Sequence, residues 1–327
     1  NRLGVEFDWY NKLTKDWLVV APVLYSYGAN APYVNGGNVK NQGLEFGLHW
    51  NDSVGEVFYG VNLTGAHNKN KVTKIANADG IIHGTGSIPW EGAEELYRAE
   101  VGMPIGYFYG YKTAGVFQNQ AEIDAYKGAL LNGENTNPGD VIYVDSNNDG
   151  VIDANDRTMI GNPHPDFTLG LSFNIEWKGI DLSISGFGSF GQQIFKCYRD
   201  FSSSPLNNYT TDILKRWTGE GSSNKYPRLA SSSNSNWNRI SSLYVEDGDY
   251  FKVQNITLGY DIAKAFKKFP LKTCRVYVTG QNLFTFTSYS GMDPEIGYGG
   301  GSGWAQGIDL GYYPSARTIL FGVNLKF

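Results

Sequence analysis

Apolar and polar residues alternate one by one in several separate stretches of the chain. In LGVEFDW, residues 3–9, every second residue is apolar and the residues between are glycine or acidic. Because successive side chains of a β-strand point to opposite faces, this pattern predicts a strand with one apolar and one polar face. Five stretches show it most clearly: 2–10, 43–50, 57–64, 167–177 and 318–327.

Three further stretches alternate less regularly and are also predicted to be strands: 181–190, 250–260 and 274–286. In the second of them the apolar phase shifts between Val253 and Ile256, which indicates a β-bulge. The connections between the eight predicted strands alternate strictly between short and long. The short ones are 51–56, 178–180 and 261–272, and the long ones are 11–38, 65–166, 191–249 and 287–316.

These strands and connections predict an all-β, antiparallel fold. Alternating short and long connections are typical of outer-membrane β-barrels, which have short periplasmic turns and longer extracellular loops. Trp9, Trp50 and Trp177 lie near predicted strand ends, where such barrels carry aromatic girdles. A soluble β-sandwich would show the same alternation, so the pattern alone leaves both architectures open.

Composition and charge exclude several classes of protein. Of the 327 residues, 15% are aromatic, 41 are glycine and only 18% are charged, which favours strands and turns over helical bundles. The net charge of −5, without a Lys/Arg cluster, gives no support for nucleic-acid binding. Cys197 and Cys274 could pair, but two cysteines are no disulfide framework, and their spacing is not that of a metal site.

Longer stretches of the sequence resemble one family of transporters. In chain order they are NRLGVEFDWYNKLTKDWL, NVKNQGLEFGL, AHNKNKVTKI, VGMPIGYFYGYKTAGVFQN, GDVIYVDSNNDGVIDANDRTMIGNPHPDFTLGLSF, RWTGEGSSNKYPRL, DYFKVQNITLGYDI, RVYVTGQNLFTFT and GIDLGYYPSARTILFGVNLKF. They resemble the carboxy-terminal part of the SusC-type, or RagA-type, TonB-dependent outer-membrane transporters of Bacteroidetes. The matching stretches follow one another from end to end of the chain, so the resemblance is specific.

The resemblance implies a multi-pass β-barrel in the cell outer membrane. Residues 1–327 would be its C-terminal part, about eight strands of a large plugged barrel of the 22-stranded class. It also implies import of oligosaccharides or peptides, energised by TonB, with a SusD-type surface lipoprotein as a lid. The sequence does not say which substrate is carried. TonB would engage an N-terminal part that we expect to lie upstream, because NRLGVEFDWY begins like the middle of a strand and lacks signal-peptide regions.

The stretch DSNNDGVIDAND, residues 145–156, has the spacing of a calcium-binding loop. The expected ligands are side-chain oxygens of Asp145, Asn147, Asp149 and Asp153, the backbone carbonyl of Val151 and the terminal carboxylate of Asp156. A sensor loop ends in glutamate and lies between helices, whereas this one ends in aspartate between predicted strands. It lies in the 65–166 connection, which we predict to be a long extracellular loop region, so a bound Ca²⁺ would be structural. A metal-free Asn/Asp/Gly turn is the alternative.

No catalytic motif stands out, so an enzyme is not expected. There is no GxSxG, HExxH or P-loop, and the four histidines are scattered. Several loop aromatics could stack on sugar rings or instead pack the loops and the lid together: Trp237, Tyr298, Trp304, Tyr312 and Tyr313. Short helices are predicted within 119–133, from a cap at Asn119 to a stop at Gly133, and within 210–219.

Two functions of different classes therefore remain. The first is TonB-dependent import through the outer membrane, with contacts to lipid, lid lipoprotein and a glycan or peptide. The second is a calcium-stabilised, extracellular carbohydrate-binding β-domain. A requirement for detergent during extraction would distinguish the first from the second.

Overall fold

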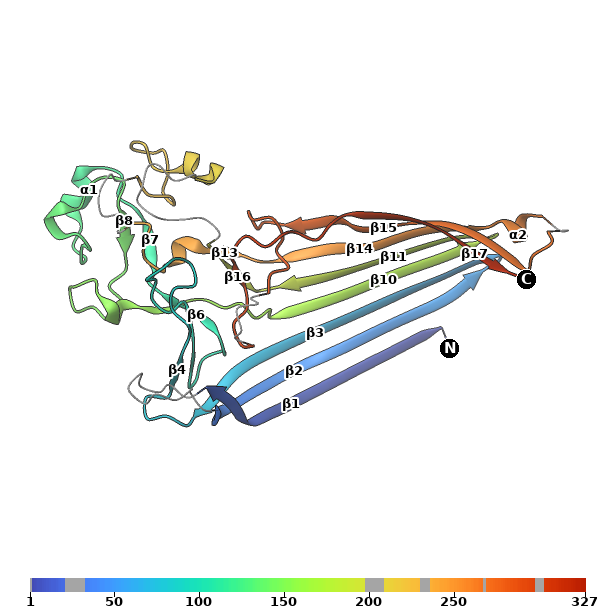
Figure 1. The fold of residues 1–327 in the computed structure, drawn as a ribbon, viewed down its shortest axis with the longest axis horizontal. Helices are drawn as coiled ribbons and strands as arrows, with labels where there is room; N and C mark the ends of the chain where they lie inside the picture. The colour runs from blue at the N-terminus through green and yellow to red at the C-terminus, as the bar shows by residue number, and fades with distance from the viewer. Residues whose placement is uncertain (1, 21–32, 198–208, 230–235, 267–268, 298–302) are drawn as a thin grey trace.

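A computed structural model describes residues 2–20, 33–197, 209–229, 236–266, 269–297 and 303–327. Its dominant feature is a long antiparallel sheet of eight strands that follow one another across the sheet in chain order (Figure 1). The strands are, in sheet order, β1 (Leu3–Val20), β2 (Tyr33–Val54), β3 (Val57–Ile75), β10 (Phe167–Trp177), β11 (Ile180–Phe190), β14 (Tyr250–Asp261), β15 (Thr273–Thr287) and β17 (Thr318–Lys326). All eight predicted strands are present in the predicted order.

Short connections join pairs of strands at one end of the sheet. Trp177 pairs with Ile180, so Lys178 and Gly179 form a two-residue turn with φ angles of 47° and 88°. Positive φ at both positions matches the type I′ turn, whose twist fits that of the flanking strands. Strands β14 and β15 are joined through helix α2 (Ile262–Ala265), where the Asp261 carboxylate accepts the backbone N–H of Ala263.

The ladder between β11 and β14 contains the predicted bulge. Its register shifts between Ser185 and Gly186, where β14 continues from Asn255 to Val253. The extra residue lets apolar side chains on both sides of the shift stay on one face of the sheet.

The two ends of the sheet differ. The short connections, the start of β1 and the end of β17 lie together at one end, as Figure 1 shows. The long connections gather at the other end, where the described residues of 76–166, 191–249 and 288–317 form what we call the outer loop unit.

The outer loop unit contains three small sheets, with strand orders β4-β5-β6-β9, β13-β12-β16 and β7-β8. Its elements are β4 (Ile81–His83), β5 (Tyr97–Glu100), β6 (Tyr107–Gly110), β7 (Thr113–Val116), α1 (Gln120–Ala125), η2 (Gly133–Asn135), β8 (Val141–Tyr143), η3 (Ala154–Asp156), β9 (Thr158–Gly161), β12 (Gln193–Lys196), η4 (Thr211–Lys215), η5 (Ser242–Tyr244), β13 (Val245–Asp247) and β16 (Ile308–Asp309).

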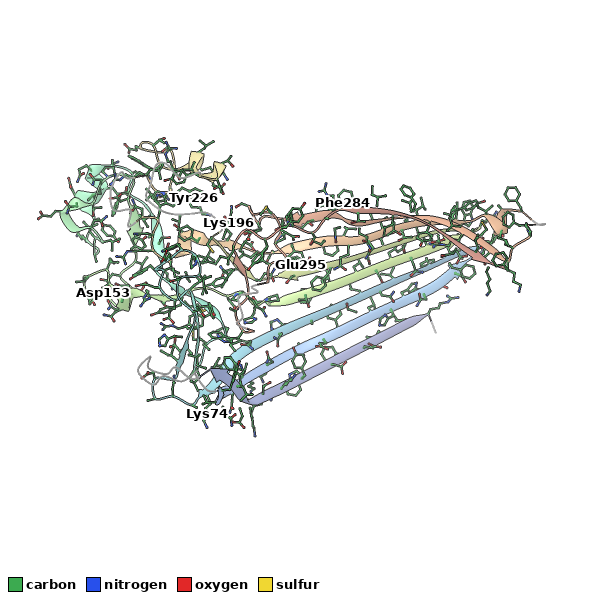
Figure 2. All side chains as sticks on the ribbon, viewed as in Figure 1. Lys74, Asp153, Lys196, Tyr226, Phe284 and Glu295 are labelled. Carbon is green, nitrogen blue, oxygen red and sulfur yellow. The ribbon has the colours of Figure 1, made fainter. Side chains whose placement is uncertain are left out.

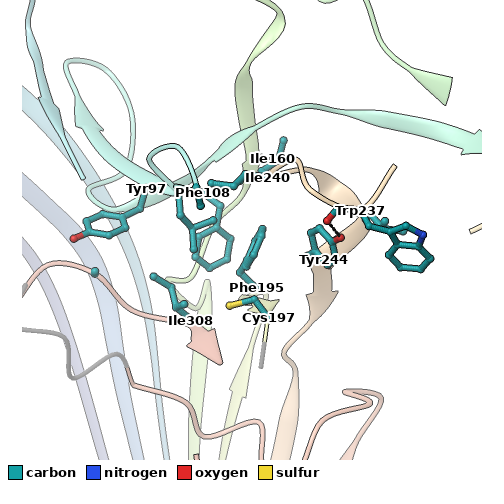
Figure 3. Close-up of a cluster of buried hydrophobic side chains, with 13 residues drawn as sticks. Tyr97, Phe108, Ile160, Phe195, Cys197, Trp237, Ile240, Tyr244 and Ile308 are labelled. Atoms are coloured by element: carbon teal, nitrogen blue, oxygen red, sulfur yellow. Dashed lines mark hydrogen bonds between the residues drawn. The ribbon is translucent and has the colours of Figure 1, made fainter. Parts of the chain in front are cut away.

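The largest buried hydrophobic cluster lies in the outer loop unit rather than beneath the long sheet. Phe195 lies 5.9 Å from Phe108 and 5.6 Å from Tyr244 between ring centroids, and all three rings are buried (Figure 3). Ile308 joins them from a third connection. Residues far apart in sequence therefore share one core, which makes the long connections a single folded body.

Several boundaries differ from the sequence predictions. Strand β3 runs to Ile75, so the first part of the predicted 65–166 loop region is strand. The first helix is only six residues long, because the chain becomes extended at Tyr126, and Gly133 begins the 3₁₀ turn η2 instead of ending a helix. The second is the 3₁₀ helix η4. Cys197 and Cys274 are both free thiols.

Among the described residues, no helix is long and apolar enough to cross a membrane.

Candidate functional site

One face of the eight-stranded sheet is apolar and exposed. Strand pairing places apolar partners opposite each other across the sheet, for example Phe7 with Phe46 and Leu63 with Leu171. The large apolar side chains of this face that are more than a third exposed include Leu3, Val5, Phe7, Trp9, Leu44, Phe46, Leu48, Val54, Leu171, Trp177, Ile180, Leu258, Tyr260, Val276, Phe284, Phe286, Ile319, Phe321, Val323 and Leu325. Soluble monomers rarely expose so large a continuous apolar surface, which therefore indicates an apolar environment or partner.

Aromatic rings form a row where this face meets the outer loop unit. The Phe167 ring stacks at 6.3 Å from Phe46 and at 6.4 Å from Phe190 between centroids. Gly65 provides the space, since a Cβ there would lie 2.3 Å from Cε1 of Phe46. At the opposite end of the strands, the same face carries Trp177.

The other face of the sheet is polar and joined by side-chain hydrogen bonds between strands. The Asn62 side-chain oxygen accepts a hydrogen bond from His49 Nδ1 over 2.9 Å, and its side-chain nitrogen donates to the Ser172 hydroxyl over 3.1 Å, which links β2, β3 and β10. On the same face, but nearer the β17 edge of the sheet, Arg275 of β15 binds the Asp181 carboxylate of β11 with two nitrogens, at 2.8 and 2.5 Å. This face is suited to water or to polar protein groups.

An open groove of about 250 Å³ crosses the polar face, lined by residues of β1, β2, β3, β10 and β11. Glu6, Asp8 and Glu45 line it, and Asp8 lies directly opposite Glu45 in the strand register. The remaining lining is mostly glycine, alanine and threonine, which leaves the space open. The groove can therefore receive a polar or cationic group from a structure that faces the sheet.

Ion pairs tie the outer loop unit together. The Lys196 ammonium binds Asp212, in the same connection, at 2.8 Å and donates to the Ser290 hydroxyl of the last connection, so it joins two connections at a point labelled in Figure 2. Burial opposes ionisation of Asp212, but hydrogen bonds from Lys196 and Lys215 prevail and lower the pKa of its carboxyl to about 2. The unit is thus held by charges as well as by its core.

A second ion cluster fixes the last connection to the polar face. Lys252 of β14, whose side chain is 3% exposed, binds Glu295 at 2.5 Å and Asp293 at 3.3 Å. Burial opposes ionisation of Asp293, but the backbone N–H groups of Ser315 and Glu295, the Ser315 side chain and Lys252 lower the pKa of its carboxyl. Sequence reasoning missed this cluster; the only signal was a lysine on the polar phase of a strand.

The calcium-like loop folds as a series of turns closed by its own side chains. The Asp145 carboxylate accepts the backbone N–H of Asp149 at 3.2 Å and of Gly150 at 2.8 Å, and Asp149 accepts that of Val151. Asn147 accepts the N–H of Asp149 and donates to its carboxylate. These are the contacts of Asn/Asp/Gly turns.

The end of this loop is a capped 3₁₀ turn. Asp156 is fully buried and accepts the N–H groups of Ser146 and Asp153, while Asp153 accepts that of Asn155 and lies at the far side of the outer loop unit (Figure 2). Throughout the described part of the chain, no three His, Cys, Asp or Glu side chains gather closely enough to hold a metal ion. Oxygen donors suit Ca²⁺ in kind, but to bind it these carboxylates would have to turn from the backbone toward one point. Calcium binding therefore stays a prediction.

The candidate ligand-contacting aromatics lie in different environments. Trp237 is 1% exposed, stacks on Tyr226 and donates its indole N–H to the Arg228 carbonyl, so it packs the core. Trp304 is partly buried and has edge contacts with the rings of Trp17 and Tyr97, at 5.7 and 4.7 Å between centroids. Tyr312 and Tyr313 are exposed, at 38% and 92%, and can reach a partner. Tyr298 lies outside the described residues.

Comparison with known proteins gives a consistent relationship. No protein-family model matches the chain. It is 33% identical over 334 residues to TonB-dependent receptor P3 of Formosa agariphila, covering all of this chain and 32% of that receptor. It is 27% identical over 333 residues to TonB-dependent receptor SusC of Bacteroides thetaiotaomicron, covering all of this chain and 30% of that protein.

Solved structures share the fold. The chain superposes over its full length on 33% of a chain of the RagAB peptide transporter, with a TM-score of 0.77 and 21% identity. The open-open state of the RagAB peptide importer gives a TM-score of 0.75 and 22% identity over the same shares. The chain spans about a third of the length of the relatives it matches. With its sequence relatives and its fold in agreement, the chain belongs to the TonB-dependent receptors of the SusC/RagA type.

Proposed function

We propose that the chain forms the C-terminal part of the wall of an outer-membrane β-barrel, together with the loops above it. The complete receptor would import oligosaccharides or peptides with energy delivered through TonB. Family membership supports this proposal, and because TonB-dependent transporters are not enzymes, it agrees with the lack of a catalytic motif in the sequence.

The observation that carries the proposal is the height of the apolar face. From Phe167 to Trp177, the aromatic residues at the two ends of β10, the strand makes ten steps. At about 3.4 Å per residue this is about 34 Å along the strand. A strand tilt of about 40° reduces it to about 26 Å, close to the ~25 Å apolar band between the aromatic girdles of bacterial barrels.

The open edges of the sheet support the proposal that further strands complete a barrel. Among the described residues, β1 pairs with β2 and β17 pairs with β15, and neither has a second partner. In hydrocarbon, every unpaired backbone group would cost several kcal/mol, so a spanning sheet has to close. The polar face, with its groove, would then line the interior opposite a plug.

The outer loop unit supports the proposal of a lid partner. It is a single folded body beyond the apolar band, and it exposes Tyr312 and Tyr313 beside the start of β17. The solved relatives are complexes called RagAB. We propose that a SusD-type surface lipoprotein docks on this unit and closes the entrance over a bound glycan or peptide.

Fractionation of cells that produce the full-length receptor tests the location. We expect it in the outer-membrane fraction, extracted only by detergent, with a folded form that changes gel mobility on boiling. Release into aqueous buffer would contradict the barrel and favour the extracellular carbohydrate-binding domain. Accumulation of labelled oligosaccharide or peptide, lost when the proton gradient is dissipated, tests transport.

A further inference from the structure

A small pocket lies where the polar face of the sheet meets the outer loop unit. Its volume is about 180 Å³, and Pro163, Tyr250, Pro294 and Glu295 are among its lining residues. Tyr250 and Lys252 are two positions apart on β14 and so share the polar face, and Glu295 marks the junction in Figure 2. The pocket is therefore on the side of the sheet opposite the apolar band.

The Tyr250 hydroxyl has no hydrogen-bond partner in the part of the chain that the structure describes. Tyr250 is 5% exposed, and no hydrogen bond within the described part of the chain involves its oxygen. The fully enclosed polar side-chain atoms without a partner in that part are Arg98 Nε, Thr136 Oγ1, Trp217 Nε1 and Ser241 Oγ. Because the Tyr250 oxygen is not one of them, it is not fully enclosed, and Tyr250 is one of the residues that line the pocket. A tyrosine hydroxyl without a protein partner can donate a hydrogen bond to a ligand or accept one from it.

The charges around the pocket favour an uncharged ligand that donates hydrogen bonds. One oxygen of Glu295 binds the Lys252 ammonium, and its other oxygen has no hydrogen-bond partner among the described residues. Asp293 binds the same ammonium, so the cluster carries two negative charges and one positive charge. An anion would be repelled by the net charge, and the Lys252 ammonium already neutralises one of the two carboxylate charges, which weakens the attraction for a second cation.

The shape of the walls favours a ring over an extended chain. Pro163, Pro294 and Ile296 offer apolar surfaces, while the Tyr250 hydroxyl and the free Glu295 oxygen offer polar edges. A sugar ring has the matching combination of C–H faces and hydroxyl edges. A peptide strand would need a free backbone edge, but β12, which also lines the pocket, is already paired with β13 and β16.

We propose that this pocket binds one sugar residue of an uncharged oligosaccharide, with the Tyr250 hydroxyl and the Glu295 carboxylate as its hydrogen-bonding groups. The assignment rests on the proposed import function and deepens it, since it selects glycan over peptide at this point of the pathway.

The test uses the full-length receptor in detergent and two variants of the pocket. Tyr250→Phe removes only the hydroxyl. Gly297→Leu fills the space, because a Cβ at Gly297 would meet no described atom within 4 Å and its φ is not in the left-handed region. The matched controls are Tyr260→Phe, at the other end of β14, and Gly303→Leu, in the same connection and also facing open space.

Binding is measured on an array of short neutral oligosaccharides built from hexoses and pentoses, and with fluorescent short peptides. Against the glycan that wild type binds most tightly, Tyr250→Phe should weaken binding about three- to tenfold, as expected for one hydrogen bond. Gly297→Leu should abolish binding, and the two controls should leave it unchanged.

Three outcomes would overturn the proposal: wild type binds no glycan on the array, glycan binding is the same in both pocket variants, or both variants weaken peptide binding instead. The boiling-dependent gel mobility of the same preparations reports on the barrel independently. A folded barrel without glycan binding would refute the pocket assignment alone, whereas loss of the folded form from wild type would refute the proposed function.

Discussion

A lysine at position 171 should test directly whether the apolar face of the long sheet contacts lipid. Leu171 is the fifth residue of the eleven in β10, close to mid-strand, and lies opposite Leu63 and Gly186 on that face. Near the middle of a bilayer, lysine on the lipid face of a barrel costs about 2–4 kcal/mol. Leu171 is 38% exposed, so on a water-facing sheet the same change would cost only about 0.5 kcal/mol.

Two control variants separate charge from other effects. Leu171→Ala shortens the side chain without adding a charge. Ser172→Lys places the same charge one residue along, on the polar face, where it removes the 3.1 Å hydrogen bond from Asn62 at a cost of about 1 kcal/mol.

The assay is urea unfolding of the full-length receptor in phosphatidylcholine vesicles, followed by the change in gel mobility. Differences in midpoint, multiplied by the urea dependence, give the differences in unfolding free energy. We expect Leu171→Lys to be the most destabilised of the three. Equal losses for Leu171→Lys and Ser172→Lys, or a loss for Leu171→Lys no larger than that for Leu171→Ala, would refute the lipid-facing assignment.

Three further predictions concern the loops and the sheet edges. If the 145–156 loop binds Ca²⁺, elemental analysis of the purified receptor should find about one ion per chain, and the double variant Asp145→Ala, Asp149→Ala should lose this ion. Equal protease cleavage of the loop with and without chelator, together with no bound metal, would leave only the metal-free turn. The Asp212 carboxyl has a folded pKa of about 2, below its unfolded value of 3.8, so its contribution of about 2 kcal/mol is fully present above pH 4 and is lost as the pH falls toward 2. The stability of the outer loop unit should therefore depend less on pH in Asp212→Asn than in wild type, when unfolding is followed by tryptophan fluorescence between pH 5 and 2. The same dependence on pH in both proteins would contradict the prediction. Residues 1–327 produced alone should give no heat-resistant barrel, because β1 and β17 lack outer partners among the described residues. Co-production with the upstream part of the receptor should restore a heat-resistant barrel. A closed, heat-resistant barrel from this chain alone would refute the need for further strands.

Strand positions were predictable where the two faces of the sheet have different surroundings. In β10, which has one exposed apolar face and one polar face, the alternation predicted the first and the last residue of the strand correctly. In β3 the alternation fades after Leu63, because the later positions, such as Asn68 and Lys71, are polar on either face. The strand nevertheless continues to Ile75, because its backbone pairs with that of β2. Backbone pairing leaves no periodic pattern in the polarity of the side chains.

The outer loop unit and the pocket were not predictable for a different reason. Phe108, Phe195 and Ile308 lie on strands of two to four residues, too short for any period to be recognised. Tyr250 and Glu295, which both line the pocket, are 45 positions apart in the sequence, and only the folded chain brings them together. For Trp237 the sequence left two roles open, a ligand contact or packing of the loops, and the burial of its side chain is what packing requires.

The shared core of the outer loop unit also limits how such a receptor can acquire a new specificity during evolution. Loops that stand apart on a barrel can be exchanged one at a time by recombination, since each carries its own contacts. Here, replacing the connection that contains Phe108 would uncover Phe195 and Ile308, which come from two other connections. Viable changes should therefore arise as point substitutions on the surface of the unit, or by transfer of the whole unit with its supporting strands, rather than by shuffling single loops.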